Sequence, residues 1–289
     1  MQLSIRRSRS AKPLSLFGAS QPLGRLWKYR SLVQNVVARD LKLRYRNSVF
    51  GFIWSLLNPL LMMGVFTIVF MVLLHTAPTE GAYRDIPFPL FLLTGILAWN
   101  YLAISIAGGM SSIVGNAGLV TKVYFPREVL PVSAVLSNTI NFLLALVVFI
   151  GATFVSGIGP ALSWLYFPLV LLSQTLFVFG IVLFIAALNV YYRDTEVIME
   201  VFITAWFFMT PIFYDITQVV HEWHGVDLPR LVRIINPMAS YITSYRDIFL
   251  LHSAPDPLFL LRSFITGMVV AILGYISFIR MSKSFGDVL

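Results

Sequence analysis

Long stretches without charge divide this chain. Asp, Glu, Lys and Arg are absent from residues 47–79, 86–121, 129–192 and 263–279. A helix needs about 20 consecutive apolar residues to cross the hydrocarbon core of a bilayer. The third stretch therefore has room for two such helices, and each of the others has room for about one. The pattern predicts an all-α membrane protein.

Glycine, proline and flanking charges mark where these helices begin and end. The longest stretch divides at Gly157-Ile158-Gly159-Pro160, its one strong turn signal. A further apolar run follows Glu200 and carries Pro211 near its end. We therefore expect six membrane-spanning helices, which cover about residues 52–74, 88–107, 132–155, 165–191, 197–214 and 258–279.

The basic residues lie mostly on one side of these spans. Six spans place both termini on the same side of the membrane. Of the 21 Lys and Arg residues, 11 lie in residues 1–46, and five more lie in segments that this topology places on the same side. Because loops rich in Lys and Arg stay in the cytoplasm, we expect both termini to be cytoplasmic. The net charge of +8 therefore indicates orientation and not nucleic-acid binding.

Composition and missing motifs restrict the chemistry. Only 12% of the residues are charged and 58% are hydrophobic, whereas about 25% are charged in an average soluble domain. The chain has no cysteine, which excludes disulfides, and no GxxxxGK[ST] phosphate-binding loop. His221 and His224 are three residues apart, not the four of the zinc motif HExxH, so we expect no metal site. Few charges fall inside the spans to relay ions, which favours an energy source outside this chain.

The N-terminal arm divides into a tail and a helix. Residues 1–24 predict a flexible basic tail, and residues 25–47 predict an amphipathic helix at the cytoplasmic interface, before a six-span domain at residues 48–289. Asp40 falls on the apolar side, where an ion pair with Arg44 would offset its burial. The alternative is a helix that only anchors the chain to anionic lipid. On a helical wheel the apolar arc holds Tyr29, Leu32, Val33, Val36, Val37 and Leu43, and the polar arc holds Arg30, Gln34, Asn35, Arg39, Lys42 and Arg46.

The segment between the fifth and sixth spans, residues 215–257, is expected on the outer side. A helix is predicted over residues 239–251, after Asn236-Pro237, and its apolar content is too high for a freely solvated loop. Short apolar helices joined by proline breaks predict re-entrant structure, which occurs only where protein or a water-filled cavity shields the backbone. The alternative is a loop packed on the outer surface.

Several short motifs together resemble one transporter family. Before and within the first span the chain reads Arg39-Asp40-Leu41-Lys42-Leu43-Arg44-Tyr45-Arg46, then Gly51-Phe52-Ile53-Trp54 and Asn58-Pro59. This resembles the entry signature of the membrane subunit, or permease, of bacterial ABC-2 type polysaccharide exporters. Only residues 1–24 fall outside the resemblance. Further similar motifs follow in order along the six spans: Pro126-Arg127-Glu128 within residues 116–131, Tyr192-Arg193-Asp194, Pro211-Ile212-Phe213-Tyr214, Asn236-Pro237 and Tyr245-Arg246-Asp247.

The resemblance implies a transport subunit and not an enzyme. Members of this family export lipid-linked glycans such as O-antigen, teichoic acid or capsule chains across the bacterial inner (plasma) membrane, through a channel between two permease copies. Two copies of a separate ATPase bind ATP and magnesium, so we expect no cofactor in this chain. The expected partners are a second copy of the chain, that ATPase, the glycan substrate and membrane lipids, without nucleic acid.

The resemblance also suggests roles for particular segments. The loop of residues 111–129 would be the coupling helix, residues 27–46 would rest beside the ATPase, and the turn at Tyr192 would be a second contact. The basic cluster before the first span would attract an anionic lipid-diphosphate head group, with simple positive-inside anchoring as the alternative. Aromatic rings in the fifth span would stack on sugars in the channel, with packing against lipid or helices as the alternative. The head-group candidates are Arg39, Lys42, Arg44 and Arg46; the ATPase-coupling candidates are Asn116, Lys122, Tyr124, Phe125, Arg127, Glu128, Tyr192, Arg193 and Asp194; the channel-lining candidates are Trp206, Phe207, Phe208 and Tyr214.

Two other functions fit parts of the sequence. An integral membrane transferase acting on lipid-linked sugars would need acids, histidines or metal ligands that face one cavity. The chain offers Asp194, Glu196 and Glu200 near one another, but their loop fits a helix-end contact better. An ABC-2 permease for a small hydrophobic substrate, such as a drug or heme, belongs to the same broad group. The long N-terminal helix and the segment of residues 236–251 favour the glycan exporters.

Overall fold

The computed structural model describes most of the chain outside its N-terminal arm. The predicted tail of residues 1–24 lies outside the described residues, as do the candidates Arg46 and Tyr124 and the pair His221 and His224. The described residues are 29–45, 53–73, 75, 82–123, 125–215, 222–223 and 226–289.

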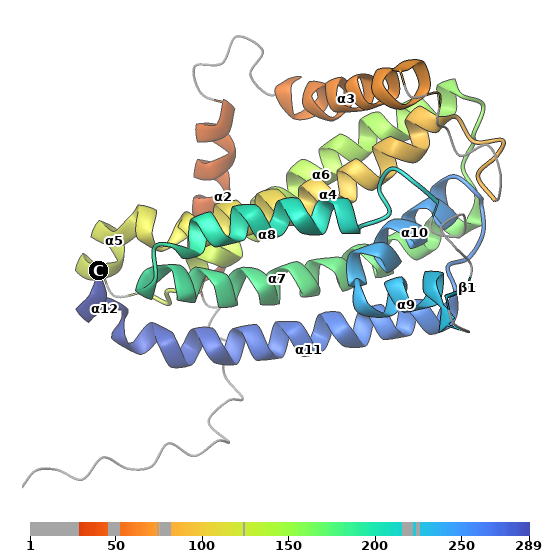
Figure 1. Ribbon diagram of the computed structural model, residues 1–289. Helices are drawn as coiled ribbons and strands as arrows, with labels where there is room; N and C mark the ends of the chain where they lie inside the picture. The colour runs from red at the N-terminus through yellow and green to blue at the C-terminus, as the bar shows by residue number, and fades with distance from the viewer. Residues whose placement is uncertain are drawn as a thin grey trace, which may run out of the picture.

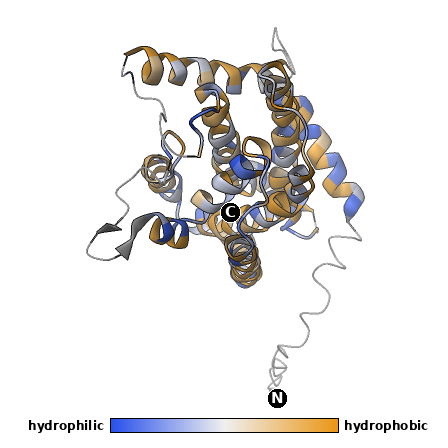
Figure 2. Cartoon of the chain, turned by 90° about the vertical axis from the view of Figure 1, so that its right-hand side faces the viewer, coloured by the Kyte–Doolittle hydropathy of each residue, from blue (hydrophilic) through white to orange (hydrophobic). Residues whose placement is uncertain are grey.

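Four helices in the described part of the chain are long and apolar enough to cross a membrane. They run alongside one another in Figure 1, and Figure 2 shows that they are mostly hydrophobic. The predicted all-α membrane fold is therefore confirmed, and one pair of two-residue strands, Glu222–Trp223 (β1) and Val226–Asp227 (β2), is the small exception. The four helices are α4 (Phe88–Ser112), α6 (Val129–Val155), α7 (Phe167–Tyr191), which follows the 3-10 helix η4 (Leu162–Tyr166), and α11 (Pro257–Met281).

The other two predicted spans differ from these four. The first consists of α3 (Ile53–Thr67), which continues as the π-helix η2 (Ile68–Leu73). The fifth, α8 (Thr195–Met209), ends earlier than the predicted residue 214. A residue that precedes proline avoids the helical conformation, and Thr210, before Pro211, is extended with φ −96° and ψ 137°. Four of the six spans are thus confirmed at membrane-spanning length.

The helical bundle has two ends, and each is recognised by the short elements that lie there. At one end, the α5 end, lie α5 (Ala117–Lys122), which follows the 3-10 helix η3 (Val114–Asn116), and α12 (Phe285–Val288), which follows η5 (Ser282–Ser284) (Figure 1). At the other end, the α9 end, lies α9 (Leu228–Ile235), beside β1. The last helix, α12, therefore lies at the same end as α5 (Figure 1).

The predicted N-terminal helix is present as α2 (Arg30–Tyr45). It runs across the direction of the long helices and packs on α6 (Figure 1). Val36 is buried, whereas Leu43, expected on the apolar arc, is 53% exposed. The expected ion pair between Asp40 and Arg44 is wrong, because Asp40 pairs with its neighbour Arg39 at 2.9 Å while Arg44 reaches α6.

Helices α7 and α11 approach each other most closely at glycines. Gly180 and Gly274 face each other, and a Cβ on either would collide with the backbone of the opposite helix. Small residues allow such backbone contact between membrane helices, where van der Waals packing replaces the hydrophobic effect as the source of association. These two helices therefore form the most extensively packed pair among the described helices.

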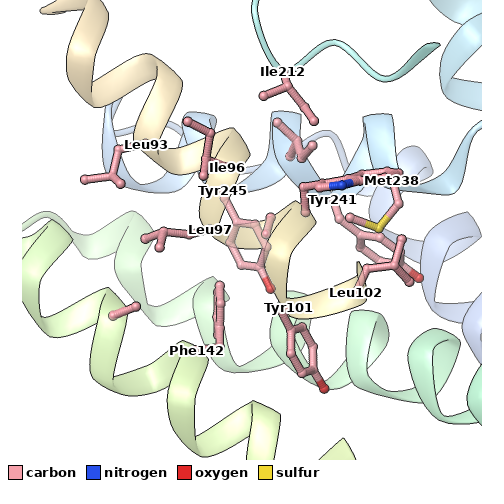
Figure 3. Close-up of a cluster of buried hydrophobic side chains, with 14 of the residues drawn as sticks. Leu93, Ile96, Leu97, Tyr101, Leu102, Phe142, Ile212, Met238, Tyr241 and Tyr245 are labelled. Atoms are coloured by element: carbon pink, nitrogen blue, oxygen red, sulfur yellow. The ribbon is translucent and has the colours of Figure 1, made fainter. Parts of the chain in front are cut away.

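A short helix, α10 (Pro237–Phe249), lies inside the bundle. All but two of its 13 residues are buried, among α4, α7 and α11. The predicted helix over residues 239–251 is confirmed, and a loop packed on the outer surface is wrong for this segment. Its aromatic rings join the core cluster of Figure 3, whose labelled residues are Leu93, Ile96, Leu97, Tyr101, Leu102, Phe142, Ile212, Met238, Tyr241 and Tyr245.

Candidate functional site

A cavity of about 290 Å³ lies between α2, α3, α4 and α6. It combines one cation, four asparagines and a tyrosine with apolar walls, in an otherwise hydrophobic bundle. Figure 3 shows Leu97, Tyr101 and Phe142 of its wall close together between α4 and α6. We name it the Arg44 cavity. The described residues that line it are Arg44, Trp54, Asn58, Pro59, Leu97, Asn100, Tyr101, Ile104, Asn138, Asn141, Phe142 and Ala145.

Local structure explains why these polar groups meet. Arg44 lies in the last turn of α2, where a cation is favoured by the helix dipole. On α6, Asn138, Asn141 and Ala145 follow one another at intervals of three and four residues, so they share one face of the helix. That face is turned toward α4 and α2. The cavity is therefore lined by one face of α6, on which two asparagines lie beside Phe142 and Ala145, and by side chains of three other helices.

Arg44 is held in place by Asn138. The Arg44 Nη2 donates a hydrogen bond of 2.9 Å to Asn138 Oδ1, and Asn138 Nδ2 donates to the backbone oxygen of Ile104 at 3.3 Å. Asn138 is only 4% exposed. The hydrogen bond to α4 thus fixes the Asn138 amide, so that the amide oxygen faces the Arg44 guanidinium.

The cavity has an accessible mouth and a buried floor. Arg44, Asn58 and Trp54 are exposed at the mouth, whereas Tyr101 and Phe142 of the floor are 3% and 5% exposed. The Tyr101 hydroxyl lies 2.9 Å from Thr139 Oγ1 and donates to Thr175 Oγ1 at 3.1 Å, which fixes its ring. A ligand can therefore reach Arg44 without any rearrangement of the core.

The four head-group candidates do not act as one cluster. Arg39 bonds to Asp40 through Nε and Nη2, and its Nη1 donates to Asn116 Oδ1 of η3 at 3.3 Å. Lys42 is exposed, and Arg46 lies outside the described residues. Of the three that are described, Arg44 alone lines the cavity, while Arg39 links α2 to the segment that precedes α5.

The aromatic candidates of α8 lie in different surroundings. Trp206 Nε1 donates to Asn236 Oδ1 at 2.9 Å, and its ring packs against Trp99 at 5.6 Å between centroids. Phe207 contacts the rings of Trp99, Phe66 and Phe213. Phe208 is 66% exposed, and Tyr214 is half-buried in the segment after α8. Phe208 is therefore the one of these four rings that is mainly exposed.

A second arginine, Arg246 of α10, clamps the break after α8. It is 2% exposed. Its Nη1 donates to the oxygen of Pro211 at 2.8 Å, and its Nη2 donates to the oxygens of Ile212 at 2.7 Å and Phe91 at 3.3 Å. The guanidinium carbon also lies 3.5 Å from the centre of the Phe91 ring. The broken backbone after α8 thus finds its hydrogen-bond donors on α10.

A tyrosine joins the start of α4 to α10 beside this clamp. The Tyr83 hydroxyl donates to Asp247 Oδ1 at 3.3 Å. Burial, to which the charge of Asp247 adds, raises the pKa of the Tyr83 phenol. The phenol therefore keeps its proton at neutral pH and can serve as a donor to the carboxylate.

The coupling candidates divide into surface and internal residues at the α5 end. Lys122 and the turn Tyr192-Arg193-Asp194 are exposed, Phe125 is half-buried, and Tyr124 lies outside the described residues. Asn116, bonded to Arg39, also donates to the oxygen of Ser112 at 2.8 Å.

Arg127 and Glu128 are less exposed than these surface residues. Arg127 donates to the backbone oxygen of Ser282 and lies over the ring of Phe285, and Glu128 is 5% exposed. Arg127 thus ties the start of α6 to the end of the chain.

The sequence predicts no role for three of the four asparagines. Asn100, Asn138 and Asn141 are uncharged residues inside predicted spans, where charge is the usual signal of a functional site, and Asn58 enters only through the motif Asn58-Pro59. The spacing of Asn138 and Asn141 on one helical face was a visible signal. Their meeting with Asn58 and Asn100 depends on the packing of three helices, which the sequence alone does not give.

Comparisons with known proteins agree with the fold and the motifs. Residues 31–250 match the family model of the ABC-2 type transporter. The chain is 38% identical over 232 residues to the O-antigen export system permease protein RfbA of Myxococcus xanthus, which covers 80% of this chain and 85% of that protein. It is 32% identical over 269 residues to the O-antigen export system permease protein RfbA of Klebsiella pneumoniae, which covers 92% of this chain and 97% of that protein. The resemblance seen in the motifs is confirmed, and the chain belongs to the ABC-2 type transporter family as a multi-pass permease subunit of the bacterial inner membrane, which implies a separate partner ATPase.

Proposed function

We propose that this chain is the transmembrane subunit of an ATP-driven exporter that moves a lipid-linked polysaccharide, of the O-antigen, teichoic acid or capsule type, from the cytoplasmic side across the inner membrane. The observation that carries the proposal is the 38% identity to an O-antigen export permease over 85% of that protein. The working unit is a homodimer with two copies of the ATPase. In this unit ATP is bound by the ATPase, and the sequence of this chain has no GxxxxGK[ST] loop.

The topology of the proposal has six crossings with the α5 end in the cytoplasm. The 15 residues of α3 and the six of η2 span about 31 Å at 1.5 Å per residue, which matches a hydrocarbon core of about 30 Å. The 15 residues of α8 reach about 22 Å. The remaining depth is covered by the broken segment that Arg246 clamps, which is allowed because α10 shields its backbone. In this reading α10 is a re-entrant helix on the outer side.

The ATPase docks at the α5 end. Leu119, Lys122 and Val123 present an exposed and partly apolar surface at α5, and Tyr192 is 67% exposed in the turn between α7 and α8. Movement at this surface reaches α2 through the hydrogen bond between Asn116 and Arg39. ATP-driven closure of the partner is therefore transmitted to the helix that carries Arg44.

The glycan path runs between two copies of the chain. Apolar side chains of α3, η2 and α8 are exposed, with Val65, Val72 and Val201 more than half exposed. Phe208, a residue of α8, adds an aromatic ring that is 66% exposed. Sugar rings would stack on such a side chain. Trp206 and Phe207, the α8 candidates that are packed inside the chain, lie on the interior side and support Phe208.

Depletion of the chain in a strain that keeps the ATPase tests the function. We expect a lipid-linked glycan to accumulate on the cytoplasmic side, and we expect ATPase activity to co-purify with the tagged chain. Accumulation of a shorter or unmodified lipid-linked sugar without ATPase association would support the membrane transferase instead. Normal glycan export with loss of export of a small hydrophobic compound would support the other type of ABC-2 permease.

A further inference from the structure

We propose that the Arg44 cavity binds the phosphate of a lipid head group that enters from the cytoplasmic leaflet, with Arg44 and Asn138 in contact with the phosphate. The site deepens the proposed function and rests on it for which lipid is bound, since a lipid-linked glycan carries such a phosphate. The presence of the site itself rests on geometry alone.

The charge of the cavity selects an anion. Among the described residues that line it, Arg44 is the one charged side chain, and none is a carboxylate. The guanidinium is exposed at the mouth, where an anion can pair with it. Guanidinium has five N–H donors in a planar fork, and it binds phosphate with two parallel hydrogen bonds. The hydrogen bond to Asn138 uses one of these donors and orients the group.

The other polar groups suit the remaining oxygens of a phosphate ester. Asn58, Asn100 and Asn141 bring amides from α3, α4 and α6 to the same space, and each amide both donates and accepts. The apolar side chains at the mouth, Trp54 and Ile104, are 42% and 41% exposed. Polar groups at the mouth beside exposed apolar side chains fit an amphiphile whose phosphate binds next to Arg44 and whose hydrocarbon chain remains in the lipid.

The size of the cavity separates a head group from a polymer. Its volume of about 290 Å³ is at the lower limit of small-molecule sites, which measure about 300 to 1,000 Å³. Along α6 it extends from Asn138 to Ala145, which is about 10 Å at 1.5 Å per residue. Phe142 and Ala145, which line it, are buried. It is therefore a holding site within one subunit, distinct from the polysaccharide path between two subunits.

The test measures lipid binding by the full chain purified in detergent with its ATPase. Native mass spectrometry counts bound phosphatidylglycerol, a polyprenyl diphosphate and inorganic phosphate, with diacylglycerol as the lipid probe without phosphate. We expect both phosphate lipids to bind and diacylglycerol not to bind. Arg44→Gln should weaken binding at least tenfold, and Arg44→Lys should restore part of it. Arg39→Gln is the matched control on the same helix, because Arg39 bonds to Asp40 and Asn116, and it should leave binding within twofold of the unmodified chain.

A second variant protects the test against misfolding. Asn138→Asp has almost the same size and places a carboxylate 2.9 Å from the Arg44 guanidinium, so it should keep the fold and the ATPase association while it repels phosphate. Equal binding of phosphate lipids by the unmodified chain, Arg44→Gln and Asn138→Asp would overturn the site. Binding of inorganic phosphate without either lipid would also overturn it as a lipid site. Binding of phosphatidylglycerol alone would keep the site and count against the lipid-linked glycan as its occupant.

Discussion

Two arginines of this chain lie among membrane helices in opposite ways. Arg246 is 2% exposed and donates to three backbone oxygens on two segments, with an aromatic ring against its face. Arg44 is exposed at the mouth of a cavity and is held by one amide, that of Asn138. The Arg246 guanidinium is enclosed by the segments that it connects, whereas the Arg44 guanidinium is oriented by the protein but accessible.

The difference separates a structural role from a binding role. A buried charge persists when its hydrogen bonds are made inside the protein, and Arg246 meets this condition by joining α10 to the chain break after α8. A ligand needs donors that the protein orients and leaves accessible. Arg44 has that arrangement, and the surrounding asparagines extend it. The same substitution at both positions should therefore give opposite results in stability and in binding.

Arg246→Gln should cause the largest loss of stability. It leaves the oxygens of Pro211, Ile212 and Phe91 without their donor, and each buried unsatisfied group costs about 1 to 3 kcal/mol. We expect a loss of more than about 3 kcal/mol, seen as a lower thermal midpoint and less folded protein in the membrane. Arg193→Gln, in an exposed turn, is the matched control. A loss below about 1 kcal/mol at position 246 would show that the clamp is not needed.

Asn236→Ala should weaken the same region by a smaller amount. Asn236 caps α10 by accepting from Met238 N at 3.1 Å, accepts from Trp206 Nε1 at 2.9 Å, and donates to Thr210 Oγ1 at 2.9 Å. Loss of an N-cap costs about 0.5 to 2 kcal/mol, so we expect about 2 kcal/mol with the side-chain bonds included. Thermal unfolding followed by tryptophan fluorescence measures it. Asn236→Ser keeps a cap but not the bond to Trp206 and should recover part of the loss; equal losses would remove the cap from the explanation.

These results bear on how much of the molecule its sequence could predict. Four spans follow from uncharged stretches, because a bilayer sets the length of the helix that crosses it. The helix α10 follows from Asn236-Pro237, since Asn caps a helix and Pro suits its first turn. The end of α8 was misplaced because apolar residues continue past Pro211, and hydropathy does not register the break that Arg246 stabilises.

The candidate site was less predictable than the fold. Arg44 was selected for its charge, but its expected partner on the same helix, Asp40, is taken by Arg39. The actual partner, Asn138, is 94 residues away in the sequence. Local spacing gives pairs within a helix, whereas the choice between Asp40 and Asn138 depends on how α2 lies across α6. The cavity draws on four helices, so no single segment of sequence contains its pattern.

Arg127 is a third case, because its exposure is intermediate between that of Arg246 and that of Arg44. It donates to the oxygen of Ser282 and lies 5.7 Å from the centre of the Phe285 ring, and it is half-buried. We expect Arg127→Gln to lower stability by about 1 to 1.5 kcal/mol, from one charged hydrogen bond and one cation–π contact. ATPase co-purification should persist. Arg193→Glu, on the exposed turn, should leave stability unchanged and reduce ATPase co-purification. Loss of the ATPase in Arg127→Gln at normal stability would instead make Arg127 a docking residue.

Arg44→Gln should have the smallest effect on stability and a large effect on transport. It removes one hydrogen bond of an exposed arginine, which is worth about 1 kcal/mol or less where solvent screens the charge. The thermal midpoint should therefore stay near that of the unmodified chain, and the ATPase should still co-purify. Export of the glycan in cells should nevertheless fall, because the head group loses its main charged contact. If Arg44→Gln were as unstable as Arg246→Gln, both arginines would be structural, and accessibility would no longer distinguish a binding guanidinium from a clamping one in this bundle.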